Sequence, residues 1–206
     1  MGSSSLSHSG ATGKWLCLEF TNSVENYRLS VPLDDIPDYA RWVAWSRRHG
    51  VISLVQADQL LMWGAHHGEG AREALAEAHA LRIQLFRLLS ARAAGAVPTD
   101  SQLQFLNDRL PESLKHLRIA AAEPDLVWQW EESFSPECLL WPVVRSAAEL
   151  LTGPECAQLR QCGGDKCTWL FVDHSKNQSR RWCDMKICGN RAKSRKHYQK
   201  TRSPAS

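Results

Sequence analysis

Residues 162–188, CGGDKCTWLFVDHSKNQSRRWCDMKIC, decide the fold of the last quarter of this chain. They hold four of its seven cysteines as two pairs, Cys162 with Cys167 and Cys183 with Cys188, and each pair has four residues between its members. Two short-range pairs separated by a loop can converge on one ion, and thiolates are the favoured ligands of structural zinc. The spacing therefore predicts one structural zinc ion held by these four cysteines.

The residues around the cysteines predict a treble-clef-like zinc finger. Gly163 and Gly164 give the first pair the backbone freedom that a tight turn requires. Residues 169–172 are apolar and favour a strand, residues 174–179 favour a turn, and residues 180–182 favour a returning strand. A helical stretch of about residues 191–200 follows the last cysteine, so the order is knuckle, hairpin and helix.

Other uses of the four cysteines fit the sequence less well. An iron–sulfur cluster also takes four cysteines, but the predicted hairpin favours zinc. A thiol redox site is disfavoured because the two-residue redox spacing is absent. His174 and His197 lie nearby, but four cysteines already fill a tetrahedron, so we expect both to be surface histidines. A module this short has little core, so zinc would be a condition of its folding.

Charge is divided unevenly along the chain. Residues 160–202 carry twelve Lys and Arg against three Asp and Glu, a net charge of +9, whereas the rest carries thirteen against nineteen, a net charge of −6. Such a basic segment indicates a polyanionic partner, and a nucleic acid fits best. The alternative is that the basic segment is a solvated charged helix that binds no partner. Asn190 is interpreted as a structural cap beside the zinc. The predicted nucleic-acid contacts are Arg180, Arg181, Arg191, Lys193, Arg195, Lys196, Lys200 and Arg202.

The preceding residues predict one mostly helical domain, residues 14–155, with a small antiparallel sheet, so the whole chain is of the α+β class. Apolar, aromatic and β-favouring residues in 14–21 indicate a strand. Apolar periodicity then predicts helices at 38–49, 53–65, 70–94, 99–110 and 139–151. Residues 114–121 and 126–130 indicate a hairpin that pairs with the first strand. Residues 156–202 form the predicted finger, and 1–13 and 203–206 are read as tails.

The remaining cysteines, Cys17, Cys138 and Cys156, stand among apolar residues and are expected to be buried small hydrophobes. Seven of the nine tryptophans lie in the predicted helical domain. We expect them mainly in the core, although some could line a small-molecule pocket. No segment has the length of a membrane-spanning helix, and the first residues lack a secretory signal, so a cytoplasmic protein without a membrane partner is expected.

Several stretches together resemble a known zinc finger. They are Leu159–Cys162 as LRQC, 167–175 as CTWLFVDHS, 179–185 as SRRWCDM and 188–193 as CGNRAK. This pattern resembles the CGNR zinc finger, which is named for the four residues found here at 188–191. The front of the chain looks like the ABATE domain that usually precedes this finger, through LCLEFTNS at 16–23 and Ala80-Leu81-Arg82. Ser23 departs mildly from the common Asn-Thr ending.

The resemblance implies a bacterial protein of the stress-induced transcription regulator type, with zinc on the four cysteines. The leading function is a zinc-dependent DNA-binding regulator whose helical domain senses a small-molecule effector or mediates homodimerisation. A zinc-braced protein–protein interaction module without DNA binding is the alternative. We expect no enzyme activity, because the cysteines close the metal site and His174, Asn177 and His197 form no recognisable catalytic cluster.

Overall fold

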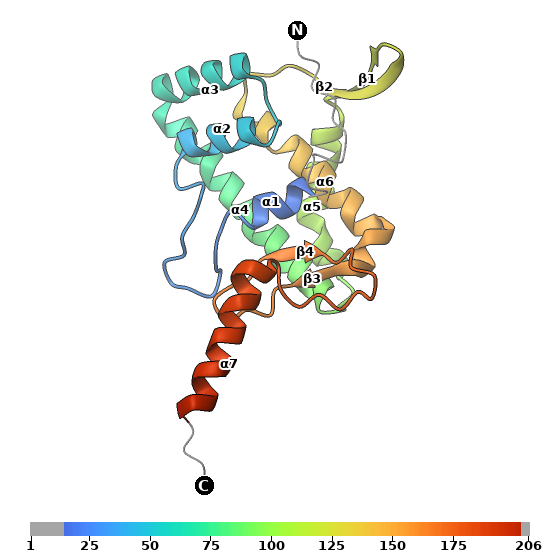
Figure 1. Ribbon diagram of the computed structural model, residues 1–206. Helices are drawn as coiled ribbons and strands as arrows, with labels where there is room; N and C mark the ends of the chain where they lie inside the picture. The colour runs from blue at the N-terminus through green and yellow to red at the C-terminus, as the bar shows by residue number, and fades with distance from the viewer. Residues whose placement is uncertain (1–14, 203–206) are drawn as a thin grey trace.

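The computed structural model describes residues 15–202, apart from the side chains of residues 196, 197 and 199–202. The predicted tails at 1–13 and 203–206 lie outside this range. A bundle of helices forms the body of the molecule, with one small hairpin at one end and a single helix projecting from the other (Figure 1). The helices of the body are α1 (Leu16–Thr21), α2 (Tyr39–Arg48), α3 (Leu54–His66), α4 (Gly68–Ala93), α5 (Asp100–Leu114) and α6 (Trp141–Thr152).

Helix α4 is the central element, and four of the other five body helices pack on it. Its buried face carries Ala78, Leu81, Leu85, Leu88 and Leu89, which recur at the three- and four-residue steps of one helical stripe. Helices α1, α2, α3 and α5 contact this helix, and α6 packs on both α1 and α5. The predicted α+β class, mostly helical with small antiparallel sheets, is confirmed.

Local sequence signals place most helix ends correctly. Ser53 and Thr99 start α3 and α5 with reciprocal capping boxes, in which each hydroxyl accepts the amide of the third helical residue. Gly50 and Gly95 follow α2 and α4 with positive φ values of 71° and 86°, which glycine adopts without strain. Helix α5 continues past the predicted end and includes Pro111.

The strand predicted at residues 14–21 is wrong, because residues 16–21 form α1 and Lys14 lies outside the described residues. Cys17, Leu18, Phe20 and Thr21 are all buried, so the segment is enclosed on several sides. A short apolar run that is buried all round has no helical or strand periodicity to distinguish the two forms. The helix satisfies its own backbone, and Ser146 of α6 accepts the Cys17 amide at 3.2 Å.

The predicted hairpin is confirmed as β1 (Leu117–Ala122) and β2 (Asp125–Trp130), which pair antiparallel with Leu117 opposite Trp130. Its pairing with a first strand is wrong, since the sheet has two strands only among the described residues. A 3-10 turn, η1 (Pro136–Leu139), leads from this hairpin into α6.

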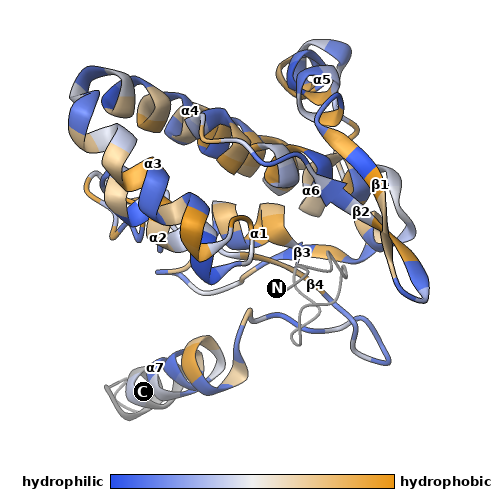
Figure 2. Cartoon of the chain, turned by 90° about the horizontal axis from the view of Figure 1, so that it is seen from above, coloured by the Kyte–Doolittle hydropathy of each residue, from blue (hydrophilic) through white to orange (hydrophobic). Residues whose placement is uncertain are grey.

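The C-terminal part begins with a second 3-10 turn, η2 (Pro154–Gln158), and a short antiparallel pair, β3 (Leu159–Gln161) and β4 (Leu170–Val172). The predicted strand at 169–172 is thus confirmed. The returning strand predicted at 180–182 is wrong. The strand β4 pairs with the preceding strand β3 instead, and residues 180–182 form an irregular loop. A π-helical turn, η3 (Met185–Gly189), then continues into α7 (Asn190–Arg202), which stands apart from the body in two views (Figures 1 and 2).

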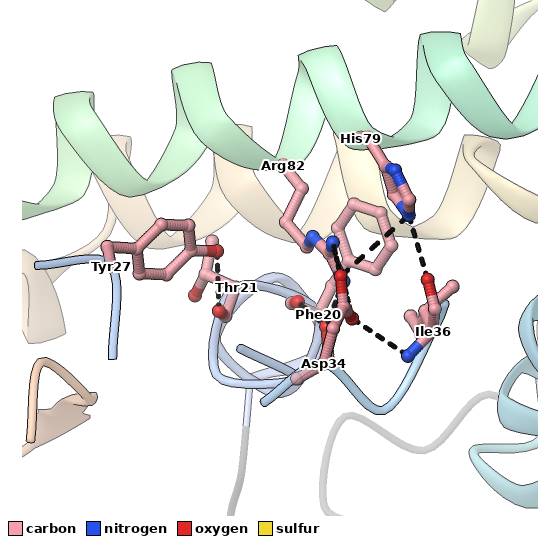
Figure 3. Close-up of polar contacts among 8 residues, drawn as sticks. Phe20, Thr21, Tyr27, Asp34, Ile36, His79 and Arg82 are labelled. Carbon is pink, nitrogen blue, oxygen red and sulfur yellow. Dashed lines mark hydrogen bonds and ion pairs between the residues drawn. The ribbon is translucent and has the colours of Figure 1, made fainter. Parts of the chain in front are cut away.

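A loop that we call the strap, residues 22–36, crosses the surface between α1 and α2. It is fastened to α4 by Arg82, whose guanidinium donates to Asp34 Oδ1 at 2.7 Å and to Ser23 Oγ at 2.7 Å (Figure 3). Tyr27 stacks on Phe86 of α4 with ring centroids 3.8 Å apart. These contacts fix the strap beside the first turn of the finger.

The remaining sequence predictions on the core are confirmed where the structure tests them. Cys17, Cys138 and Cys156 are buried, and burial raises the pKa of the Cys17 thiol to about 12. Trp42, Trp45 and Trp141 are core residues, whereas the Trp128 side chain is 46% exposed. No helix in the described part of the chain is long and apolar enough to cross a membrane.

Candidate metal centre and basic helix

The first cysteine pair sits in the turn that joins β3 to β4. Gln161 and Leu170 are the last paired residues of the two strands, and the Cys162 amide donates to Trp169 O at 2.8 Å just beyond them. The Cys167 amide closes the turn on Gly164 O at 3.1 Å. A Cβ at Gly164 would lie 3.3 Å from the Cys167 Cβ, a tight contact, so a larger residue here would press on this cysteine.

The second pair enters from the other side on the loop and turn that precede α7. The Gly163 amide donates to Arg181 O at 2.9 Å and joins this loop to the first turn. Asp184 caps η3 by accepting the Ile187 amide at 2.9 Å on its side chain, while its carbonyl accepts the Cys188 amide at 2.9 Å. The start of the helix therefore presents Cys188 to the first pair.

The four sulfurs form a compact cluster of the size that a metal ion requires. All lie within 4.8 Å of one another, with Sγ separations of 3.7 Å for Cys167–Cys183 and 3.6 Å for Cys183–Cys188. A tetrahedral zinc ion with bonds of about 2.3 Å sets its sulfurs about 3.8 Å apart. All four are free thiols rather than disulfides. The residues therefore make a metal-ion site whose donor set and spacing fit zinc.

The electrostatics of the cluster favour a bound cation. The hydrogen bond between Cys167 and Cys183 lowers the pKa of Cys167 to about 5 and raises that of Cys183. Burial raises the pKa of Cys188 to about 11. Four thiolates so close together repel one another, and a divalent cation removes this repulsion, so metal binding and deprotonation occur together.

The predicted nucleic-acid contacts fall into four groups, the last of which is Arg180 alone and is described below. Arg191 and Lys193 are exposed on α7, and Arg181 is exposed with its guanidinium 5.6 Å from the Trp182 ring centre. Arg195 is half-buried and forms an ion pair with Asp165 of the first turn. The side chains of Lys196, Lys200 and Arg202 lie outside the described residues, although their backbone belongs to α7.

Arg180 turns back into the finger. Its guanidinium lies 4.8 Å from the Phe171 ring centre, and its Nε donates to Trp182 O at 2.8 Å. A terminal nitrogen also donates to Cys183 O. This arginine braces the loop that carries the third cysteine, a role that the run of basic residues in the sequence does not reveal.

Two further polar residues behave as the sequence suggests. Asn190 donates its side-chain amide to Lys186 O at 2.9 Å and so joins η3 to α7, which agrees with its reading as a cap. His174 is an exposed histidine 3.1 Å from Glu155, away from the sulfurs, and the His197 side chain lies outside the described residues.

Sequence reasoning missed the role of Asn22, which it named only as part of the LCLEFTNS stretch. Its side chain donates to Leu170 O at 2.8 Å and accepts the Leu170 amide at 2.8 Å, so it occupies the free edge of β4 as a third strand would. In the sequence, the signal for this role is the position of Asn22 directly after the apolar run 16–21.

A four-cysteine cluster at a knuckle and a helix start defines a zinc-finger protein. Comparison with protein families agrees: the CGNR zinc finger matches residues 158–201. The ABATE family, described as "Putative stress-induced transcription regulator", matches residues 15–154, which is most of the chain. The protein therefore belongs to the ABATE family and carries a C-terminal CGNR zinc finger. No curated protein matches the chain.

Proposed function

We propose that the protein is a zinc-dependent DNA-binding transcription regulator. One zinc ion on Cys162, Cys167, Cys183 and Cys188 holds the loop and η3 together and thereby fixes the direction of α7. The zinc is structural, since four thiolates leave no open position on a tetrahedral ion. In this arrangement the finger, residues 156–202, is the DNA-binding part, and residues 14–155 form the regulatory part.

The observation that carries the proposal is the projecting helix. Helix α7 packs on η3 at its base and extends away from the body (Figure 1). It has thirteen residues, so it is about 20 Å long, and the major groove of B-DNA is about 12 Å wide and admits a helix. Its exposed Arg191 and Lys193, with Arg181 beside its base, suit phosphate oxygens.

A single helix reads few base pairs, and DNA-binding proteins commonly increase their footprint by twofold symmetry. We therefore include homodimerisation, or an effector-controlled change in it, as the role of the helical part. The family description, a stress-induced regulator, supports this division of labour.

Binding to a labelled duplex tests the proposal at two salt concentrations. Several phosphate contacts predict an affinity that falls by orders of magnitude, roughly 10³-fold or more, between 50 and 200 mM salt. A mobility-shift titration with zinc-loaded protein measures this fall. Binding that ignores salt, or no binding at 50 mM salt, rejects DNA as the partner.

A further inference from the structure

The two cysteine pairs have different supports in the molecule. The first pair lies in the turn between β3 and β4, and Leu159 and Leu170 of these strands are each 1% exposed and belong to the main helical core. Asn22 clamps Leu170 through two hydrogen bonds of 2.8 Å, as described above. The helical core therefore holds Cys162 and Cys167 through contacts that involve no sulfur.

The strap adds a second fastening to the same turn. The Tyr27 amide donates to Thr168 Oγ1 at 3.1 Å, next to Cys167 in the sequence, and Thr168 is 1% exposed. Gln161, next to Cys162, donates to Ser90 of α4 at 3.2 Å. Both cysteines of the first pair thus have a neighbour that is hydrogen-bonded to the helical body.

The second pair lacks such support. Cys183 and Cys188 pack in a small cluster whose other members are Cys162, Cys167, Phe171 and Trp182, so most of this core consists of the metal-site cysteines themselves. The apolar side chains beside them, Met185 and Ile187, are 49% and 53% exposed. The described side chains of residues 174–202 therefore bury little apolar surface, and segments of this kind need a metal to fold.

We propose that the metal site is assembled in two steps: the helical core holds Cys162 and Cys167 ready, with Asn22 as the positioning residue, and metal binding then orders residues 174–202. This inference rests on the metal-binding part of the proposed function. Its consequence is that metal occupancy regulates the basic helix without unfolding the helical body. A preformed half-site also strengthens metal binding, because only the second half must be ordered.

Hydrogen exchange measured by mass spectrometry on the full chain tests the order of assembly. The reduced protein is compared after chelation and after addition of one equivalent of Zn²⁺. We expect residues 16–172 to keep their protection in both states, and residues 174–202 to be protected only with Zn²⁺. Loss of protection throughout the chain on chelation overturns the proposal, as does protection of residues 174–202 without metal.

Two variants test the positioning role. Asn22→Ala removes both hydrogen bonds to Leu170, and we expect Zn²⁺ affinity to fall about tenfold, as for other residues that orient metal ligands. Thr168→Val keeps the buried shape but removes the acceptor for Tyr27, and a smaller loss is expected. Asn177→Ala, at an exposed position of the finger loop, is the matched control and should keep wild-type affinity.

Competition with a coloured chelator measures these affinities, and the thermal unfolding of the metal-free variants reports the helical body. Equal Zn²⁺ affinity for Asn22→Ala, Thr168→Val and wild type overturns the positioning role. Neither hydrogen exchange nor chelator competition involves DNA. Failure to bind DNA while residues 174–202 order on Zn²⁺ removes the proposed DNA function and supports this inference.

Discussion

The Arg82 guanidinium and the Asp34 carboxylate form a two-point ion pair, with nitrogen–oxygen distances of 2.7 and 2.5 Å (Figure 3). Arg82 lies on α4 and is 3% exposed, whereas Asp34 lies on the strap. Asp34 also accepts the Ile36 amide at 2.8 Å, and His79 Nε2 donates to Ile36 O at 2.8 Å. The pair therefore fixes the strap, and with it the segment that contacts the finger, to the central helix.

Replacing Arg82 by alanine tests this role. The change leaves the Asp34 carboxylate in a largely enclosed site without its partner, and breaking such a pair should lower the free energy of unfolding by roughly 3 kcal/mol. Arg87→Ala removes an exposed arginine from the same helix and is the control. Urea unfolding followed by tryptophan fluorescence measures both. Equal stability of the two variants contradicts a structural role for the pair.

Sequence patterns predicted elements with a strong apolar period, such as α3, α4 and α5. They failed at α1, because burial on several sides removes the periodicity that separates a helix from a strand. They also failed at residues 180–182, which resemble a strand but have no partner, since β3 already pairs with β4.

The metal site likewise has features that local sequence patterns predict and features that they do not. The spacing of the cysteines predicted the cluster, because ligand chemistry restricts which residues can hold zinc. The clamp between Asn22 and Leu170 joins residues 148 positions apart, and no local pattern encodes such a contact. Likewise, the inward turn of Arg180 depends on the Phe171 ring, and a run of basic residues gives no sign of it.

Loss of one cysteine should abolish metal binding. Cys183→Ser removes a central thiolate, and hydroxyls are poor ligands for zinc in such sites. The purified wild-type protein should contain one zinc per chain, and the variant should contain nearly none, as measured by elemental analysis. Cys156→Ser changes a buried cysteine outside the cluster and should keep its zinc. Full zinc content in Cys183→Ser would contradict the assignment.

Neutralising the exposed cations of α7 should weaken DNA binding by a similar factor whatever the sequence of the DNA. Arg191→Ala and Lys193→Ala each remove one expected phosphate contact, and each should reduce the slope of log affinity against log salt by about 1. Arg72→Ala removes an exposed arginine near the start of α4, at the end of the molecule opposite α7, and should leave the slope unchanged (Figure 1). The slopes come from mobility-shift titrations at four salt concentrations.

The β1–β2 hairpin should lose stability in acid through Glu131. The His116 ring, 3.0 Å from the Glu131 carboxylate, and the neighbouring Arg118 hold the pKa of Glu131 below its usual value of 4.5. A carboxylate with a lowered pKa in the folded state stabilises the protein above the unfolded pKa, and this stabilisation disappears as the pH falls through the folded pKa. Glu131→Gln should therefore be less stable than wild type at pH 5.5, and this difference should shrink as the pH falls below 4.5. Urea unfolding at pH 5.5 and pH 3 measures the difference, and a difference of equal size at both values contradicts the prediction.

The last prediction separates two roles of Arg180, as a brace of the finger and as a DNA contact. In the structure the Arg180 guanidinium donates hydrogen bonds to Trp182 O and Cys183 O and lies over the face of the Phe171 ring. Lysine keeps the charge but lacks the planar fork that makes several directed hydrogen bonds at once. If Arg180 is a brace, Arg180→Lys and Arg180→Ala both weaken Zn²⁺ binding in chelator competition, because the loop that carries Cys183 is released. If instead it contacts DNA phosphates, both variants keep wild-type Zn²⁺ affinity and Arg180→Lys largely keeps DNA binding. Since two of its nitrogens, Nε and one terminal nitrogen, already donate to carbonyls within the finger, we expect the first result, with Arg181→Ala as the control that keeps Zn²⁺ affinity.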